Sequence, residues 1–232
     1  FQAFESELVL TDLLQVETRL DRIKKEGKVT AERGLLEQLY GQLEAGKSLR
    51  GLSLLENELQ MVAGFRFLSL KPCILVLNRT EVQAQPPEES FVKQAAEHGV
   101  EWISLCATTE AEIAELAPEE QKAFLVEFGL ADSARSRFIA QAYAQLKLIS
   151  FLTAGPDECR AWTIERGTSA RKAAGKIHSD IERGFIRAEV IAFADFERMP
   201  TELQCREAGK MRLFGKDYVV EDGDIVHFRF AT

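Results

Sequence analysis

The stretch that decides the fold is KPCILVLNRTE, residues 71–81. Its centre, CILVLN, is a short continuous apolar run, which is typical of a strand buried on both faces of a parallel sheet. The following PPEESFVKQAAEHG (residues 86–99) has the composition of a helix, and VEWISLCA (residues 100–107) is a second apolar run. Strand, helix and strand at this spacing predict a right-handed βαβ unit with two parallel strands.

The first strand ends in Asn78-x-x-Glu81, at the place where many P-loop nucleotide-binding domains recognise a purine base. In guanine-specific domains the motif is Asn-Lys-x-Asp, and its carboxylate accepts two hydrogen bonds from guanine. Glu81 is longer by one methylene, which argues against guanine and leaves adenine open. A strand that ends in Asn, with Glu81 merely at the surface, is the alternative interpretation.

A literal match to the phosphate-loop motif G-x-x-x-x-G-K-[ST] occurs at GQLEAGKS, residues 41–48. A working phosphate loop joins a buried strand to the N-terminus of a helix, so that backbone N–H groups face the phosphates. Here the preceding ERGLLEQLY has helical periodicity, Leu43 continues its apolar face, and Glu44 would place a carboxylate beside the phosphates. We therefore interpret residues 41–48 as the end of a helix, with Lys47 near its C-terminus.

Helical periodicity dominates before residue 69. Apolar residues at 8, 10, 13, 14, 16, 20 and 23 predict a helix over 5–26, and similar patterns predict a second helix around 35–43 and a third over about 52–68. They suit a helical hairpin or coiled-coil arm, and ordinary helices packed on a domain are an equal alternative. Residues 108–130 are predicted helical with a break at Pro118, and another helix is predicted over 133–147.

From residue 148 the pattern changes again. Two strands around a turn at 154–157, a helix over 169–184, a strand in FIRAEVIAF, a short helix in ADFERM, and strands in MRLFGKDYVV and DIVHFRF follow the order of a β-grasp fold. The expected architecture is multidomain, of the α/β and α+β classes. The predicted boundaries are 1–68 for a helical arm, 69–147 for the C-terminal part of a nucleotide-binding α/β domain, and 148–232 for the β-grasp domain.

The composition, 46% hydrophobic and 28% charged with a net charge of −8, suits a globular protein of 232 residues. No apolar run approaches the roughly 18 residues of a membrane span, and no secretory signal is recognisable. The chain opens with Phe rather than Met, so we expect a fragment or a processed start. The four cysteines include no C-x-x-C pair, which predicts reduced core thiols rather than a zinc site.

The chain resembles the YchF subfamily of Obg-related P-loop NTPases. The resemblance rests on ESELVLTDLLQVETRLDRIKK, KPCILVLNRTE, ISLCATTEAEIAELAPEEQKAFL, the long stretch LISFLTAGPDECRAWTIERGTSARKAAGKIHSDIERGFIRAEVIAF, and the ending GKDYVVEDGDIVHFRF. It implies a coiled-coil arm, a partial P-loop NTPase sheet, and a C-terminal TGS domain, which is ubiquitin-like. It also implies a cytoplasmic protein that acts with the ribosome or RNA in translation or stress responses.

The same resemblance implies hydrolysis of ATP in preference to GTP, with Mg²⁺ in the intact family member. Asn78, Arg79, Glu81 and Ala107 would line the base, and Arg79 would act mainly through its backbone. The family's phosphate loop, magnesium-binding switch segments and catalytic histidine precede the arm and are not found in these 232 residues. We therefore expect no ATP hydrolysis by this chain alone, no tightly bound cofactor, and no catalytic or metal role for His98, His178 or His227.

A stand-alone TGS-containing adaptor that binds RNA or protein without nucleotide is the alternative function. The possible RNA-binding set is basic: Arg160, Arg166, Arg171, Lys172 and Lys176. Acidic residues are interleaved with it, since residues 148–232 carry 13 basic and 14 acidic side chains. Docking onto protein is therefore a close rival. A two-stranded sheet would also expose an edge, and we expect self-association through it.

Overall fold

The computed structural model describes residues 1–27, 31–80, 87–155 and 158–231. The chain divides into two compact units, Phe1–Arg137 and Phe138–Thr232. Both units combine helices with strands, so the fold is mixed α/β. The three-domain division expected from the sequence remains a prediction.

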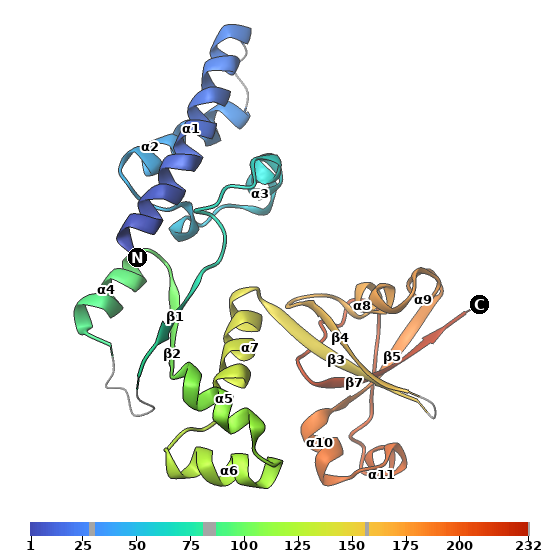
Figure 1. Ribbon diagram of the computed structural model, residues 1–232. Helices are drawn as coiled ribbons and strands as arrows, with labels where there is room; N and C mark the ends of the chain where they lie inside the picture. The colour runs from blue at the N-terminus through green and yellow to red at the C-terminus, as the bar shows by residue number, and fades with distance from the viewer. Residues whose placement is uncertain (28–30, 81–86, 156–157, 232) are drawn as a thin grey trace. The chain divides into compact units, whose positions relative to one another are not determined.

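The first unit begins with a helical hairpin. Helices α1 (Gln2–Glu26) and α2 (Ala31–Glu44) lie side by side (Figure 1). The buried face of α1 repeats at spacings of three and four residues: Glu5, Val9, Asp12, Val16, Leu20 and Ile23. Both predicted helices are confirmed, but Leu10 and Leu14, assigned to the apolar stripe, are 51% and 55% exposed. The buried face of α1 instead includes two acidic residues, Glu5 and Asp12.

The third predicted helix, over about 52–68, is wrong as one element. The segment follows a 3₁₀ turn η1 (Leu49–Gly51) and holds helix α3 (Glu56–Val62) and a second 3₁₀ turn η2 (Ala63–Phe65). Asp12 keeps the end of the predicted range out of a helix. Its carboxylate accepts hydrogen bonds from the backbone N–H groups of Leu68 at 2.8 Å and Ser69 at 2.7 Å, and from the Ser69 hydroxyl at 2.7 Å. These N–H groups are thereby held outside any helical ladder.

The GQLEAGKS segment is the end of α2, as interpreted from the sequence. Gly46 has φ 71°, a left-handed conformation in which glycine is favoured. Its N–H donates to the Leu43 carbonyl at 2.9 Å, and the Lys47 N–H donates to the Gln42 carbonyl at 3.1 Å. This pair of bonds is the Schellman arrangement that closes a helix. The segment therefore does not form the strand-loop-helix geometry that holds phosphates.

The expected βαβ unit follows the hairpin. Strands β1 (Ile74–Asn78) and β2 (Glu101–Leu105) are parallel, with Ile74 opposite Glu101 and Asn78 opposite Leu105, and helix α4 (Glu89–Glu97) connects them. The prediction that β1 is buried on both faces is wrong within the described residues, since Val76 is 48% exposed. Beyond β2 lie α5 (Ala107–Glu115), α6 (Pro118–Glu127) and α7 (Ala134–Gln145). Pro118 is the first residue of α6, which confirms the predicted break.

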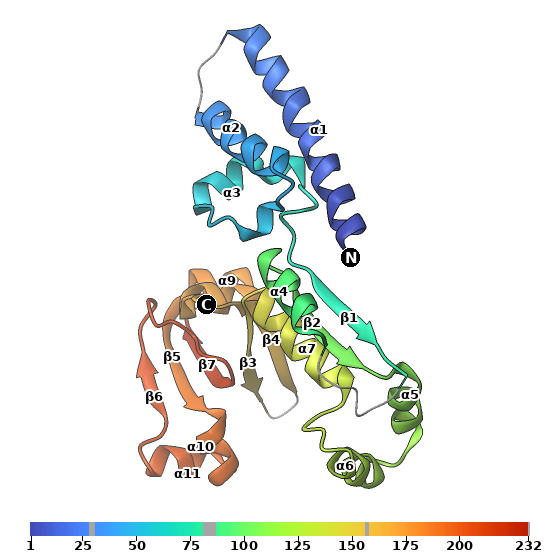
Figure 2. The ribbon, with the colours of Figure 1, turned by 90° about the vertical axis from the view of Figure 1, so that its left-hand side faces the viewer.

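The second unit is built on a five-stranded sheet in the order β4-β3-β7-β5-β6 (Figure 2). Its strands are β3 (Leu148–Ala154), β4 (Cys159–Glu165), β5 (Phe185–Ala192), β6 (Arg212–Phe214) and β7 (Asp224–Phe230). Among the strand pairs of this sheet within the described residues, β3–β7 is parallel and the others are antiparallel. Helix α8 (Ala170–Ile177) packs its alanines on one face, against Ile149, Phe151, Val190, Val226 and Phe228. Helices α10 (Phe193–Arg198) and α11 (Glu202–Glu207) cover one end of the other face, around Ile191 and Ile225.

Three sequence-based expectations for the second unit need correction. The helix predicted over 169–184 is broken at His178, whose extended backbone separates α8 from α9 (Ser179–Arg183). The predicted strand MRLFGKDYVV is a strand only at Arg212–Phe214, because Val219 forms an isolated bridge to Ser169 instead. Of the four free cysteines, Cys106 and Cys205 are buried, but Cys73 is only half-buried and Cys159 is exposed.

Within the described residues, no helix combines the length and the apolar character that crossing a bilayer would need. The same residues contain no group of three or more His, Cys, Asp or Glu side chains that could hold a metal ion.

Candidate functional site

The carboxyl ends of β1 and β2 form the candidate base site. The side-chain Oδ1 of Asn78 accepts a hydrogen bond from the backbone N–H of Ala107 at 3.0 Å. One residue further, the Arg79 N–H donates to the Leu105 carbonyl at 2.8 Å and extends the parallel ladder. Asn78 and Ala107 are both exposed, so the rim formed by the two strand ends faces solvent. The structure thus brings together three of the four residues expected at the base, while Glu81 lies outside the described residues.

Asn78 acts on the first turn of α5. Ala107 is the first residue of this helix, and a helix N-terminus has N–H groups without partners inside the helix. The side chain of Asn78 satisfies one of them from the neighbouring strand end, and so links the two loops across the sheet. Asn also has an amide NH₂ group, so it can donate a hydrogen bond to a ligand while its oxygen accepts from the Ala107 N–H.

Sequence reasoning missed Cys106, the residue directly before α5. Its Sγ lies 3.1 Å from the Thr108 hydroxyl oxygen and accepts a hydrogen bond from the Thr109 hydroxyl at 3.2 Å. Hydrogen bonds from Thr108 and then Thr109 lower the pKa of the Cys106 thiol. The buried sulfur therefore holds the two threonine side chains of the first turn of α5, next to the exposed rim. The signal in the sequence was Cys-Ala-Thr-Thr, residues 106–109, at the end of an apolar run.

The amino ends of the same two strands meet at one buried arginine. Arg50 is 4% exposed at its side chain and contacts the Glu5 carboxylate, 2% exposed, at 2.8 Å. Its Nε donates to the Lys71 carbonyl at 2.9 Å, just before β1, and Nη1 lies 3.5 Å from the His98 carbonyl, just before β2. Arg50 therefore fixes helix α1 and the starts of both strands, at the edge of the sheet opposite the rim.

The basic residues expected to bind RNA are spread over the second unit. All five side chains are exposed. Arg160 lies on β4, where its guanidinium carbon stacks 4.3 Å from the centroid of the Trp162 ring, and Arg166 follows the other end of that strand. Arg171, Lys172 and Lys176 lie on α8. Trp162 is half-buried and its Nε1 donates to the Thr153 hydroxyl at 2.9 Å. Arg160 already covers one face of this ring.

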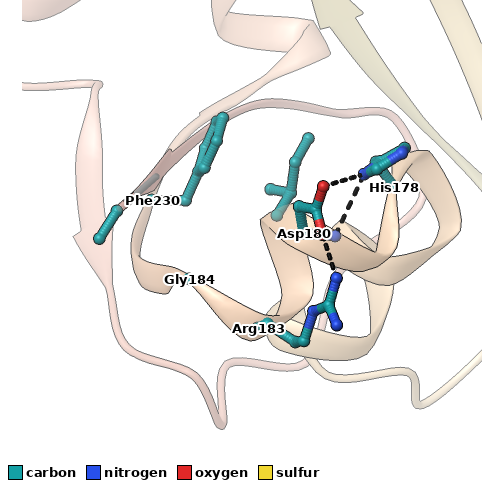
Figure 3. Close-up of a pocket in the computed structure, with 7 residues that line it drawn as sticks. His178, Asp180, Arg183, Gly184 and Phe230 are labelled. Carbon is teal, nitrogen blue, oxygen red and sulfur yellow. Dashed lines mark hydrogen bonds and ion pairs between the residues drawn. The ribbon is translucent and has the colours of Figure 1, made fainter.

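A pocket of about 740 Å³ opens in the second unit between α9 and the end of β7 (Figure 3). Asp180 is the residue around which the charged groups of this pocket gather. The Asp180 carboxylate forms an ion pair with Arg183, and the Asp180 N–H donates to His178 Nδ1 at 3.1 Å. Figure 3 shows Phe230 standing apart from these charges. The charges compensate one another, so the pocket favours neither anions nor cations. His178 is exposed and caps α9, which fits the surface role expected for it.

Comparisons with known proteins bear on both units. Residues 148–231 match the family model YchF-GTPase_C, described as a protein of unknown function (DUF933). The chain is 42% identical to the ribosome-binding ATPase YchF of Haemophilus ducreyi over 99% of its length, and 40% identical to that of Bacillus subtilis over 97%. It superposes on the YchF GTPase of Schizosaccharomyces pombe with a TM-score of 0.85 and 30% identity, covering 98% of the chain. The chain belongs to the YchF family.

The match covers only part of each YchF relative. The chain spans 65% of the H. ducreyi protein, 64% of the B. subtilis protein and 64% of the S. pombe chain. Within the YchF family, the relatives named here as ribosome-binding ATPases therefore carry residues that have no counterpart in these 232. The hairpin, the β1–β2 rim and the five-stranded sheet all lie in the shared part.

Proposed function

We propose that this chain is the base-recognising and ribosome-binding portion of a YchF-type ATPase. The observation that carries the proposal is the hydrogen bond from the Ala107 N–H to Asn78 Oδ1 at 3.0 Å, which joins the ends of β1 and β2 into one exposed rim. The names of the relatives, ribosome-binding ATPases at 40–42% identity, support the same role. The proposal includes ATP, in preference to GTP, as the ligand whose base meets the rim, and a cytoplasmic site of action.

The finer architecture belongs to the same proposal. We assign the α1–α2 hairpin to the coiled-coil arm of the family, and the five-stranded sheet with α8 to a TGS domain of the β-grasp type. The sheet order β4-β3-β7-β5-β6, with one parallel pair in its middle and a helix on one face, supports this assignment.

Chemically, the rim can read a base but offers little to a triphosphate. The Asn78 amide NH₂ group can donate to a purine ring nitrogen, and the Glu81 carboxylate, two residues after Arg79, can accept from the 6-amino group of adenine, while its extra methylene disfavours the fork to guanine. Positioning and neutralising the phosphates account for most of phosphoryl-transfer catalysis. Since residues 41–48 end a helix, we expect this chain alone to bind nucleotides weakly and to hydrolyse no ATP.

Adenosine is expected to shift the backbone amide resonance of Ala107 in ¹⁵N-resolved NMR spectra, with a dissociation constant on the order of 1 mM, and guanosine is expected to shift it less. The reason is that a nucleoside presents the base without the missing phosphate contacts. Asn78→Asp is the matched variant, because it keeps the oxygen that holds Ala107 and removes the NH₂ donor. We expect it to abolish the adenosine shift while keeping the hydrogen bond to the Ala107 N–H in the free protein. If neither nucleoside changed the chemical shift of the Ala107 amide, the proposed base site would be wrong.

An adaptor that binds the ribosome without nucleotide is the second candidate, favoured by the helical conformation of residues 41–44. The same titration separates the two functions, because an adaptor would show ribosome co-sedimentation and no response of Ala107 to either nucleoside. ATP turnover by the purified chain that Glu81→Ala abolished would contradict both.

The β1–β2 sheet is expected to self-associate. Within the described residues β1 pairs only with β2, and an isolated parallel pair has two open edges and one strand with an exposed Val76. We therefore expect static light scattering to report dimers or larger species that grow with protein concentration. Val76→Lys should reduce them, because a charge at an edge strand opposes further pairing. A monomer at all concentrations would count against this prediction.

A further inference from the structure

A groove opens on the helical hairpin, between α1 and the turn η2, and we call it the α1–η2 groove. Its volume is about 420 Å³, and its lining residues are Leu14, Gln15, Thr18, Arg19, Arg22 and Phe65. Ligand-binding clefts usually have volumes of roughly 300–1,000 Å³, so this groove is large enough to receive side chains of another molecule. Leu14 is 55% exposed, so the groove presents an apolar side chain to solvent.

The floor of the α1–η2 groove is apolar. The Thr18 hydroxyl donates to the Leu14 carbonyl at 2.8 Å, so it is used within α1 and the threonine methyl group remains for contacts. The Phe65 ring stacks on that of Phe67, with 5.0 Å between centroids and 15° between planes. Arg66, between these two residues, has φ 53°, and Phe67 is 2% exposed. Phe65 is therefore supported by the core, and binding needs little ordering of this surface.

Basic side chains stand along one flank of the groove. Acidic residues outnumber basic ones in the first unit, yet none of the lining residues is acidic and two are arginines. Arg19 already donates two hydrogen bonds of 2.8 Å to Glu32. Arg22 is exposed and forms no hydrogen bond or ion pair within the described part of the chain. Its guanidinium group is therefore available to a carboxylate of a ligand.

The other flank of α1 is acidic, which restricts what can occupy the groove. Glu17 and Asp21 line a separate pocket there, together with Glu37 of α2. An RNA backbone needs several cations along its path, and here it would meet one unpaired guanidinium group and then carboxylates. An added strand is also excluded, because the backbone groups in the middle of α1 are bonded within the helix. A helix that carries apolar side chains at helical spacing, with acids on one flank, fits both the shape and the charge.

We propose that the α1–η2 groove binds an amphipathic acidic helix of a partner protein. Leu14 and Phe65 contact the apolar side chains of that helix, and Arg22 pairs with a carboxylate on its flank. The apolar contact supplies most of the affinity, while the charge pair at the rim selects the partner and fixes its direction. This inference goes beyond base recognition and ribosome binding, and it depends on neither.

The test uses a fluorescein-labelled helical peptide of roughly 18 residues, long enough to form a helix alone. It carries leucines at helical spacing, glutamates on one flank and alanines elsewhere. We expect anisotropy to show binding to the full chain with a dissociation constant on the order of 10–100 μM. Leu14→Asp should weaken binding at least about tenfold, because it places a charge on the apolar floor and repels the glutamates.

Arg22→Gln should weaken binding of the glutamate peptide about threefold to tenfold and reduce its salt dependence. Asp21→Asn is the matched control, because it removes one exposed charge from the neighbouring position of α1 on the acidic flank. It should stay within about twofold of the parent. Leu14 and Arg22 are both exposed, so the melting temperature should be unchanged in each variant.

A charge exchange separates direct pairing from an indirect effect on the hairpin. Arg22→Glu should bind the glutamate peptide weakly, and should bind the same peptide with lysine in place of glutamate about tenfold better than the parent chain does. A loss of structure could not produce this gain. If the lysine peptide bound the parent and Arg22→Glu equally, Arg22 would not contact the ligand and the inference would be wrong.

Further outcomes would also overturn the inference. One is the absence of binding by the glutamate peptide at about 1 mM. Another is equal binding of a scrambled peptide of the same composition, which would reduce the interaction to non-specific charge. Oligouridylate that bound the parent chain as tightly as the peptide, and lost affinity in Arg22→Gln, would identify a polyanion rather than a helix as the ligand.

Discussion

Arg50→Met is expected to destabilise the first unit by about 3–5 kcal/mol, which is the usual consequence of leaving one partner of a buried ion pair alone. Glu5 is 2% exposed and has Arg50 as its charged partner at 2.8 Å, while its other oxygen, Oε1, has no hydrogen-bond partner within the described chain. Methionine keeps much of the volume of the arginine stem but supplies neither charge nor donors. The Lys71 carbonyl would lose its contact with Arg50 as well, while the His98 carbonyl would keep only the hydrogen bond from the Ser48 hydroxyl.

The measurement uses the fact that each unit holds one of the two tryptophans, Trp102 in the first and Trp162 in the second. Urea unfolding of a Trp162→Phe background, followed by Trp102 fluorescence, reports on the first unit alone. We expect the midpoint to fall with little change in slope. Adding Glu5→Gln should restore a large part of the loss, because the remaining buried charge is removed.

Arg19→Met is the matched control for the same hairpin. Arg19 forms two hydrogen bonds of 2.8 Å with Glu32, but the two side chains are 31% and 27% exposed. An exposed ion pair contributes only about 0–1 kcal/mol. If Arg50→Met lowered stability no more than Arg19→Met does, the joint between α1 and the strands would have no special role. Because Arg50 fixes the starts of both strands, its loss should also broaden the Ala107 resonance at the rim.

The sequence could predict those parts of the fold that local patterns determine. Helix α1, the parallel β1–β2 pair and the closure of α2 at Gly46 were all readable, because each depends on periodicity or on a glycine at a helix end. Proximity of Asn78 and Ala107 also followed, since the carboxyl ends of neighbouring parallel strands meet at one edge of a sheet.

Features that depend on distant partners were not predictable. Glu5 and Asp12 occupy buried positions of α1 at helical spacing. Their burial could not be predicted, because charged residues are normally exposed and their partners Arg50 and Ser69 are remote in sequence. The predicted helix over 52–68 failed for the same reason. Likewise, the strand FIRAEVIAF places Arg187 and Glu189 on one face by its period of two, but only the register with β7 reveals Arg229 opposite.

Gly184→Ala is expected to destabilise the second unit by about 3 kcal/mol, at the upper end of the usual effect of overpacking. A Cβ built on Gly184 would collide with the carbonyl oxygen of Ala231 and lie 3.1 Å from its carbonyl carbon. Both atoms are backbone, and the Ala231 N–H donates to the Gly184 carbonyl at 2.8 Å. The end of β7 would therefore have to move away from α9, and the pocket that holds Phe230 would open (Figure 3).

Gly175→Ala is the matched control, because its Cβ would meet mainly the far end of the flexible Glu182 side chain. Alanine is also the better helix former within α8, by about 0.8–1.0 kcal/mol. Its urea midpoint, followed by Trp162 fluorescence in a Trp102→Phe background, should match or exceed that of the parent. The Gly184 variant should unfold at clearly lower urea. Equal midpoints for the two alanine variants would mean that the end of β7 moves away from α9 at little cost, and would contradict this prediction.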